Sequence, residues 1–184
     1  HDIPTPLGGG LAVVPVVLVF WVALALLSIS ESPRILTLSV AGGALVLAVV
    51  SWIDDLKGVS SVTRLIIQYL VVIVILALPS ESRLTFQGLA PLWLDKTLTA
   101  ILWVWFINLF NFMDGIDGIA SVETLSIGLG ITLLAGTVDW QPLGQYQALV
   151  LAGAAVGFLW WNWSPAKVFF GDVGSVPLGF LLGW

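Results

Sequence analysis

Five aspartates stand in three short polar segments of an otherwise apolar chain, and their types and spacing could support chemistry at a phosphate. The first segment contains the pair Asp54-Asp55, followed by Lys57. Adjacent carboxylates at a helix end repel each other, and burying either is costly without a cation or another partner. Neighbouring helical residues point ~100° apart, so we expect different partners for the two, such as a metal ion and a substrate proton. Taken alone, a solvated helix end explains the pair equally well.

The second segment contains four polar residues, one at every third position: Asn108, Asn111, Asp114 and Asp117. On a regular helix these side chains would spread over about half the circumference. Gly115 and Gly118 could let the backbone unwind and bring both aspartates toward one pocket. An amide-bonded helix contact followed by a glycine turn is the weaker explanation, because two amides and two acids exceed what helix packing needs.

The third segment is Gly171-Asp172-Val173-Gly174-Ser175. Glycines around an aspartate, ahead of a new helix, suit close approach of the backbone to an anionic ligand, and a helix N-terminus favours phosphate. A tight turn capped by Asp172 or Ser175 is an equally good explanation of this segment alone. Lys57, for its part, could pair with a phosphate or only anchor a helix end.

Together the acids indicate a hard metal ion. The chain has one histidine and no cysteine, and carboxylate oxygens without soft ligands favour Mg²⁺ or Mn²⁺ over zinc. Such an ion commonly bridges a diphosphate, so the pattern favours phosphate chemistry in a membrane setting.

The elements that must position these residues are predicted to be membrane-spanning helices. The chain is 59% hydrophobic and 9% charged, which is too few charges to cover a soluble surface. Continuous apolar runs without alternation exclude a membrane barrel. The expected fold is an all-α, polytopic transmembrane helix bundle, with six complete spans and the start of a seventh after Gly174: Leu11–Ile29, Ile35–Ile53, Arg64–Leu78, Leu98–Met113, Ile119–Ala135 and Tyr146–Trp161.

Alternating spans place all the polar segments on one side of the membrane, together with the opening loop His1–Gly10. The connectors on the other side contain no such cluster. A single active face is the simplest cause. Lysine and arginine are evenly divided between the two sides, so the positive-inside rule does not orient the chain.

The motifs resemble the polyprenyl-phosphate N-acetylhexosamine-1-phosphate transferases, the glycosyltransferase family that includes the peptidoglycan enzyme phospho-N-acetylmuramoyl-pentapeptide transferase. The resemblance covers almost the whole chain. The landmarks, in family order, are Pro4-Thr5-Pro6 with Gly9-Gly10, Asp54-Asp55, the block from Asn108 to Gly118, and Gly171-Asp172 with Gly174-Ser175.

The resemblance implies transfer of N-acetylhexosamine-1-phosphate from a UDP-sugar to undecaprenyl phosphate, with release of UMP and dependence on Mg²⁺. It also implies a multi-pass protein of the bacterial inner membrane with a cytoplasmic active site. By matching position, Asp172 resembles the principal Mg²⁺ ligand, and Asp54 and Asp55 resemble the pair that handles the lipid phosphate. Asn111 and Asp114 would complete the metal site.

Asn108 and Asp117 resemble further parts of the nucleotide and metal pocket. Substrate contacts are expected from five more residues: Lys57, Gly115, Gly118, Gly171 and Ser175. The expected partners are the two substrates and the bilayer, with no nucleic acid; a homodimer is left open.

The chain departs from the family because it stops before a histidine-rich loop and begins after a usual first helix. We therefore expect residues 1–184 to be a single transmembrane catalytic domain that lacks N-terminal and C-terminal helices. The sequence Asn111-Phe112-Met113-Asp114 indicates the branch that initiates O-antigen or capsule chains. The alternatives are peptidoglycan lipid I synthesis by the same chemistry and, from another class, a membrane cation transporter.

Overall fold

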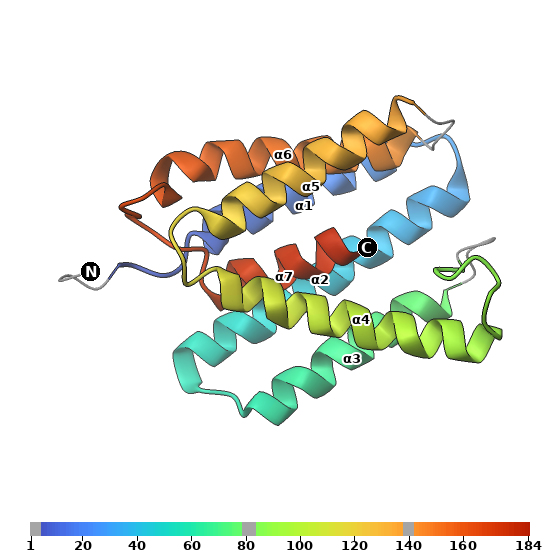
Figure 1. Ribbon diagram of the computed structural model, residues 1–184, viewed down its shortest axis with the longest axis horizontal. Coiled ribbons are helices and arrows are strands. Elements are labelled where there is room, and N and C mark those ends of the chain that lie inside the picture. Colours follow the sequence, from blue (N-terminus) through green and yellow to red (C-terminus); the bar gives the residue numbers. More distant parts are fainter. Residues whose placement is uncertain (1–4, 79–83, 138–141) are drawn as a thin grey trace.

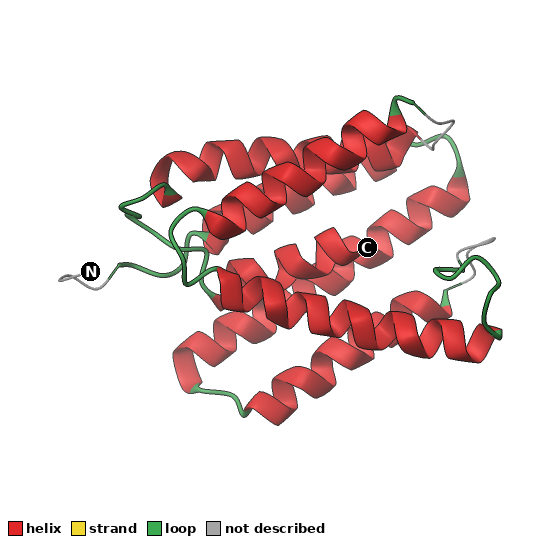
Figure 2. Cartoon of the chain, viewed as in Figure 1, coloured by secondary structure: helices red, strands yellow, loops and turns green. Residues whose placement is uncertain are grey.

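The computed structural model describes residues 5–78, 84–137 and 142–184. Within these residues the chain forms seven α-helices, and the closest approach to a strand is a single bridge between Leu7 and Phe169 (Figures 1 and 2). The helices are α1 (Gly10–Leu27), α2 (Glu31–Lys57), α3 (Ser61–Ala77), α4 (Leu92–Met113), α5 (Ile119–Ala135), α6 (Pro142–Asn162) and α7 (Asp172–Gly183).

The structure confirms the prediction of an all-α, membrane-type bundle. By length and composition, four helices could cross a membrane, namely α1, α2, α4 and α6. The other three, α3, α5 and α7, are shorter apolar helices. The bounds of α5 match the prediction, whereas α2 and α4 begin earlier than expected.

The predicted start of the last helix, after Gly174, was wrong. The backbone N–H groups of Gly174 and Ser175 both donate to the carbonyl oxygen of Gly171 at 2.9 Å. Gly171 has φ +70°, so it cannot continue a right-handed helix backward. The helix therefore begins at Asp172, and this acid stands in its first turn instead of in a loop.

The short helix α7 is the centre of the bundle. All its residues from Val173 to Leu182 are buried, because it lies between α1, α5 and α6 on one side and α3 and α4 on the other (Figure 1). It packs most closely against α2 and α4 and also contacts α1 and α5. An apolar helix buried all round fits a core position better than a lipid-facing one.

Glycine permits the tightest of these contacts. A Cβ added at Gly174 would lie 2.6 Å from the Cα of Gly10, the first residue of α1. A Cβ at Gly10 would lie 2.2 Å from the Cα of Gly174. Because neither residue has a side chain, the first turns of α1 and α7 touch backbone to backbone.

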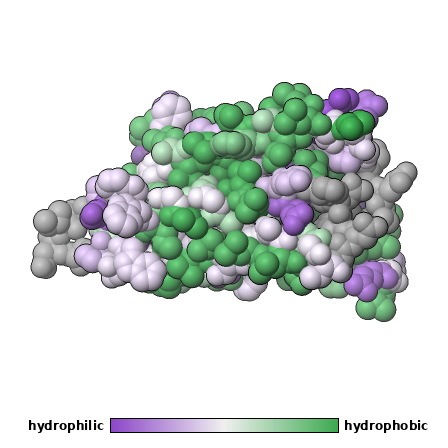
Figure 3. Space-filling view, turned by 90° about the horizontal axis from the view of Figure 1, so that it is seen from above, coloured by the Kyte–Doolittle hydropathy of each residue, from purple (hydrophilic) through white to green (hydrophobic). Residues whose placement is uncertain are grey.

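The connections that carry the predicted site gather at one end of the bundle. The loop before α1 and the α2–α3, α4–α5 and α6–α7 connections lie at the left in Figure 1. The opposite end carries the α1–α2, α3–α4 and α5–α6 connections (Figure 1). On the face drawn in Figure 3, apolar side chains cover the middle and hydrophilic ones lie toward both ends. Of the opening motif, Pro4 lies outside the described residues.

Candidate functional site

Two of the predicted aspartates converge on one arginine. Nη1 of Arg64 lies 2.8 Å from Oδ2 of Asp54 and 2.7 Å from Oδ2 of Asp172. The three residues come from three elements: the last turn of α2, the first turns of α3 and the first residue of α7. The arginine thus links segments that are distant in the sequence, and all three side chains remain partly open to solvent.

The turn between α2 and α3 holds this group in place. Gly58 ends α2 with φ +71°, and the backbone N–H of Val59 donates to Oδ1 of Asp54. Ser60 then caps α3, since its Oγ accepts from the N–H of Thr63 at 3.1 Å. Asp54 therefore stabilises the turn through one oxygen and pairs with Arg64 through the other.

Asp55 differs from its neighbour because its side chain is exposed. It makes no hydrogen bond or ion pair with another residue that the structure describes, although the charges of Asp172, Asp54 and Arg64 all act on it. Asp54 therefore has partners within the protein, namely Arg64 and the N–H of Val59, whereas the Asp55 carboxylate has none among the described residues.

Asp114 is buried and holds the segment that leads into α7. Its Oδ1 accepts from the N–H of Phe170 at 3.1 Å, and its Oδ2 accepts from the N–H of Gly171 at 2.8 Å. Burial raises the pKa of Asp114 to about 6, against the lowering effect of the two N–H groups, and Asp172 raises it further. Asp114 therefore fixes the residues immediately before Asp172.

Asp117 holds the other half of the α6–α7 connection, where its Oδ2 accepts from the N–H of Ala166 at 3.1 Å. Asn162, at the end of α6, supports the same connection. Its Nδ2 donates to the carbonyl oxygen of Val168 at 3.0 Å, and its Oδ1 accepts from the Ser121 hydroxyl at 2.8 Å. Both aspartates of the central motif thus face this connection, through separate contacts.

The two asparagines of the motif face α7 and α3. The Ser175 hydroxyl donates to Oδ1 of Asn111 and also lies 2.9 Å from the carbonyl oxygen of Gly171. Nδ2 of Asn108 donates to Oε1 of Gln68 at 2.7 Å and to the carbonyl oxygen of Val104 at 2.8 Å. The motif therefore binds α4 to both neighbouring helices.

A cavity of about 220 Å³ opens between α2, α3, α4 and α7 beside the Arg64 group. Six of its ten lining residues are polar, and the other four are apolar. The lining residues are Leu47, Val50, Ser51, Ser61, Arg64, Leu65, Gln68, Asn108, Asn111 and Val176.

The acids fit a divalent cation only in part. Among the described residues, no three acidic or histidine side chains stand close enough to hold a metal ion together. Asp54 and Asp172 do converge on one positive group, and with Asp55 they exceed the charge of Arg64. A hard divalent cation at these carboxylates would offset that excess. The oxygens predicted for Asn111 and Asp114 already accept hydrogen bonds from Ser175 and from backbone N–H groups.

Several residues that were predicted to contact the substrate lie outside the Arg64 group. Lys57 and Gly115 are exposed, and Gly118 begins α5 with φ +75°. A Cβ added at Gly171 would lie 3.1 Å from the backbone nitrogen of Gly8. The space left at Gly171 therefore accommodates the opening loop, which pairs with this segment through Gly9 N–H to Phe169 O at 2.9 Å. Asp172 does not cap α7 through its side chain, so the capping explanation of this acid was wrong.

Arg64, Gln68 and Asn162 belong to the site or its support, but none of them was predicted to be a site residue. Their positions in the sequence could have indicated a role in the site. Arg64 and Gln68 are four residues apart, on one face of an apolar helix. Asn162 is the last residue of an apolar helix, nine residues before the predicted motif that begins at Gly171.

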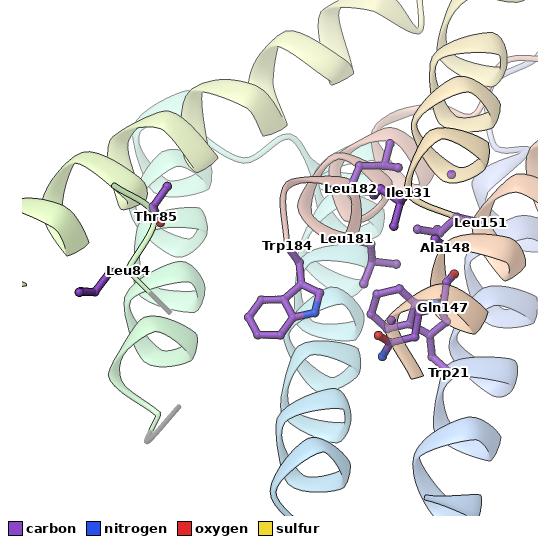
Figure 4. Close-up of a pocket in the computed structure, with 12 residues that line it drawn as sticks. Trp21, Leu84, Thr85, Ile131, Gln147, Ala148, Leu151, Leu181, Leu182 and Trp184 are labelled. Carbon is purple, nitrogen blue, oxygen red and sulfur yellow. Dashed lines mark hydrogen bonds between the residues drawn. The ribbon is translucent and has the colours of Figure 1, made fainter. Parts of the chain in front are cut away.

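A second cavity, of about 480 Å³, lies toward the opposite end of the bundle (Figure 4). Trp21 and Gln147 stand next to each other in its wall, with Leu181 and Trp184 of the C-terminal end nearby. Among the residues that the structure describes, no acid lines this cavity. We therefore place the candidate site at the Arg64 group.

Fold and site together define a multi-pass membrane protein whose acids and amides gather at one end of a helical bundle. Residues 37–184 match the model of glycosyl transferase family 4. The chain is 30% identical to the phospho-N-acetylmuramoyl-pentapeptide-transferase of Orientia tsutsugamushi, over 97% of this chain and 58% of that protein. It is 32% identical to the decaprenyl-phosphate N-acetylglucosaminephosphotransferase of Mycolicibacterium smegmatis, over 100% and 49%.

The chain belongs to glycosyl transferase family 4. It spans about half the length of these curated relatives. Neither relative's name refers to O-antigen or capsule synthesis, so the predicted O-antigen or capsule branch stays a prediction.

Proposed function

We propose that the protein transfers N-acetylhexosamine-1-phosphate from a UDP-sugar to undecaprenyl phosphate and releases UMP. The observation that carries this proposal is the convergence of Asp54 and Asp172 on Arg64, at the loop end of a membrane bundle. Membership in glycosyl transferase family 4 and the names of both relatives support the same reaction class.

In the proposed reaction an oxygen of the lipid phosphate attacks the sugar-bearing phosphorus of the UDP-sugar. A new P–O bond forms, and the bond between that phosphorus and the oxygen of UMP breaks, so that UMP leaves with both electrons. Arg64 would bind phosphate oxygens. Asp55, whose carboxylate makes no bond in the described residues, would accept the proton of the lipid phosphate.

Asp172, the predicted principal ligand, and Asp54, which was predicted to handle the lipid phosphate, are the residues that would hold Mg²⁺. Asn111 and Asp114 were predicted as further ligands, but their oxygens accept hydrogen bonds from Ser175 and from backbone N–H groups. When bound, Mg²⁺ would supply charge neutralisation at the two phosphates. Asp114 fixes the backbone before Asp172 through the N–H groups of Phe170 and Gly171. This carboxylate would therefore keep Asp172 aimed at the reacting phosphates.

We further propose six complete spans with the site on the cytoplasmic face of the bacterial inner membrane. α3 and α5 have 17 residues each, which is slightly short for a hydrocarbon core of ~30 Å. Their ends join the same two groups of connections as the four longer helices (Figure 1). A cytoplasmic site is where a nucleotide sugar is available.

The arrangement does not favour a cation transporter, the alternative from another class. Such a protein would need acids along a path through the bundle. Asp95, a buried acid toward the opposite end, accepts from the backbone N–H groups of Thr85 and Phe86 at 3.2 and 2.9 Å. This acid is therefore used to hold a loop.

The test is transfer by the full-length protein, purified in detergent, with undecaprenyl phosphate, Mg²⁺ and a panel of radiolabelled UDP-sugars. The panel includes UDP-N-acetylhexosamines and UDP-N-acetylmuramoyl-pentapeptide, because the Orientia relative suggests peptidoglycan lipid I synthesis as the second candidate. We expect one donor to give a lipid-linked sugar and an equal amount of UMP. Absence of lipid product with every donor would contradict the proposed function.

A further inference from the structure

Gln68 is a buried amide in an apolar stretch of α3, one helical turn after Arg64. Its exposed fraction is 5%. Its Oε1 accepts from Nδ2 of Asn108 at 2.7 Å, and the same Nδ2 donates to the carbonyl oxygen of Val104 at 2.8 Å. These two bonds use both N–H groups of Asn108, so Gln68 fixes the orientation of the Asn108 amide.

The other polar atom of Gln68 is not used within the described part of the protein. Nε2 of Gln68 makes no hydrogen bond there, yet no fully enclosed side-chain nitrogen or oxygen of the described residues lacks a partner. The Nε2 atom must therefore reach open space. The cavity beside Arg64 supplies that space, because Gln68 and Asn108 both line it.

The cavity suits the phosphate end of a lipid better than a nucleotide. One part of its wall is polar and includes Arg64 and Asn111. Leu47, Val50, Leu65 and Val176 make the apolar part. Its volume of about 220 Å³ is below the roughly 300–1,000 Å³ of pockets that enclose drug-sized ligands. A phosphate with the first carbons of an isoprenoid chain would match both its chemistry and its size.

We propose that Gln68 binds a phosphate oxygen of the polyprenyl phosphate acceptor through Nε2, while its Oε1 holds Asn108 in place. This inference depends on the proposed function, because it names the substrate that enters this cavity. A neutral amide can orient the attacking phosphate without pairing with its charge. Arg64, by contrast, would withdraw electron density from any oxygen that it binds.

Two variants separate the two halves of this role. Gln68→Met removes both the donor and the acceptor while keeping a similar shape. Gln68→Glu keeps an acceptor for Asn108 but replaces the donor with an oxygen. We expect both variants to raise the KM for undecaprenyl phosphate by at least about tenfold, the loss of one hydrogen bond to a charged group. The KM for the UDP-sugar should change by less than about twofold.

Gln147→Glu is a matched control. Gln147 is also a buried glutamine, with an exposed fraction of 7%, and its Nε2 donates to the Thr37 hydroxyl at 2.9 Å. It lines the cavity at the opposite end (Figure 4). This variant should leave the KM for the lipid unchanged.

Three results would overturn the inference. The first is wild-type kinetics in both Gln68 variants. The second is a rise in the KM for the UDP-sugar alone. The third is normal lipid KM in Gln68→Glu with a lower kcat only in Gln68→Met, which would show that Gln68 merely supports Asn108. Wild-type protein that transfers sugar phosphate separates these results from failure of the proposed function, which would show as wild-type inactivity.

Discussion

At the scale of residues, the five aspartates differ in what holds them. Asp54 and Asp172 pair with an arginine, whereas Asp114 and Asp117 accept from backbone N–H groups. Asp55 makes no such bond with a described residue. The bonds of Asp114 and Asp117 to backbone N–H groups hold the fold, so replacing these acids should change stability. Asp54 and Asp172 pair with Arg64, whose place a substrate or a cation could take, so replacing them should change activity.

Asp172→Asn should reduce transfer to less than about a tenth of the wild-type rate at saturating Mg²⁺, a loss above ~1.4 kcal/mol in the transition state. The amide keeps the shape but loses the charge that would hold the ion and pair with Arg64. Thermal stability in detergent should fall only slightly, because an ion pair that is partly open to solvent contributes little.

Glu123→Gln is the control for Asp172→Asn, since this half-buried acid lies in α5 outside the motifs. It should keep full transfer activity. If Asp172→Asn kept more than about a tenth of the wild-type turnover, the metal role of Asp172 would be wrong.

The raised pKa of Asp114 makes stability depend on pH. Between its ordinary value of 3.8 and about 6, the folded protein binds a proton that the unfolded chain releases. The stabilising contribution is full below pH 3.8 and is lost as pH rises to about 6, a change of roughly 3 kcal/mol at 1.36 kcal/mol per pKa unit. Without divalent cations, the thermal midpoint should therefore fall relative to Asp114→Asn between pH 4.5 and 7.

Thermal unfolding of both proteins in one detergent, with EDTA present, measures this difference directly. Equal pH slopes for wild type and Asp114→Asn would show that Asp114 does not titrate in this range. An asparagine keeps only one of the two acceptor oxygens, so the absolute stabilities of the two proteins will differ. The test therefore compares only how the thermal midpoint of each protein changes with pH.

At the scale of elements, α7 positions the site because it brings Asp172 to Arg64 and Ser175 to Asn111. Its place depends on the backbone contact between Gly10 and Gly174. Overpacking a well-packed interface typically costs about 1–3 kcal/mol, and here the added methyl would meet backbone. We therefore expect Gly174→Ala to lower the thermal midpoint and abolish transfer together.

Gly153→Ala is the matched control, because a Cβ at this helical position meets nothing within 4 Å. Its effect should be about neutral or slightly stabilising, as for any exposed glycine replaced within a helix. An equally stable Gly174→Ala protein would show that α1 and α7 can separate without cost.

Helices were predictable from the sequence where apolar runs had clear ends, as the bounds of α5 show. The start of α7 was not, because glycines on both sides of Asp172 suggested a loop. The conformation of Gly171, fixed by packing against Gly8, decides where that helix begins. The acids of the site were predictable as a group, but their partners are backbone N–H groups and an arginine from distant segments, which no local pattern encodes.

At the scale of the whole molecule, the connections sort into two ends, and labelling can test this arrangement. Residues 1–184 contain no cysteine, so single cysteines give little background there. Ile116 and Leu89 have exposed fractions of 51% and 91% and lie in connections at opposite ends. In sealed inside-out vesicles, Ile116→Cys should react with an impermeant maleimide while Leu89→Cys should not. Labelling of both from the same side would contradict the proposed topology.

The end of the bundle at which each connection lies could be predicted from the order of the helices, because consecutive helices run in opposite directions (Figure 1). The order of the helices around α7 did not follow, since α6 packs against α5 and α1 while α7 packs most closely against α2 and α4. Apolar helices offer many equivalent faces to one another. Individual hydrogen bonds between helices then decide which faces meet. One example is the bond from Trp103 Nε1 in α4 to the carbonyl oxygen of Phe180 in α7, at 2.9 Å.

The central place of α7 also sets the order in which the protein can mature during synthesis. Because α7 is the last of these helices to leave the ribosome, α1 to α6 reach the bilayer with a gap where it belongs. Until residues 170 and 171 arrive, the Asp114 carboxylate has neither N–H partner, and Arg64 has Asp54 alone. A nascent chain stalled before α7 should therefore be a substrate for membrane quality control, since it would lack the partners that α7 and the residues before it supply to these polar groups.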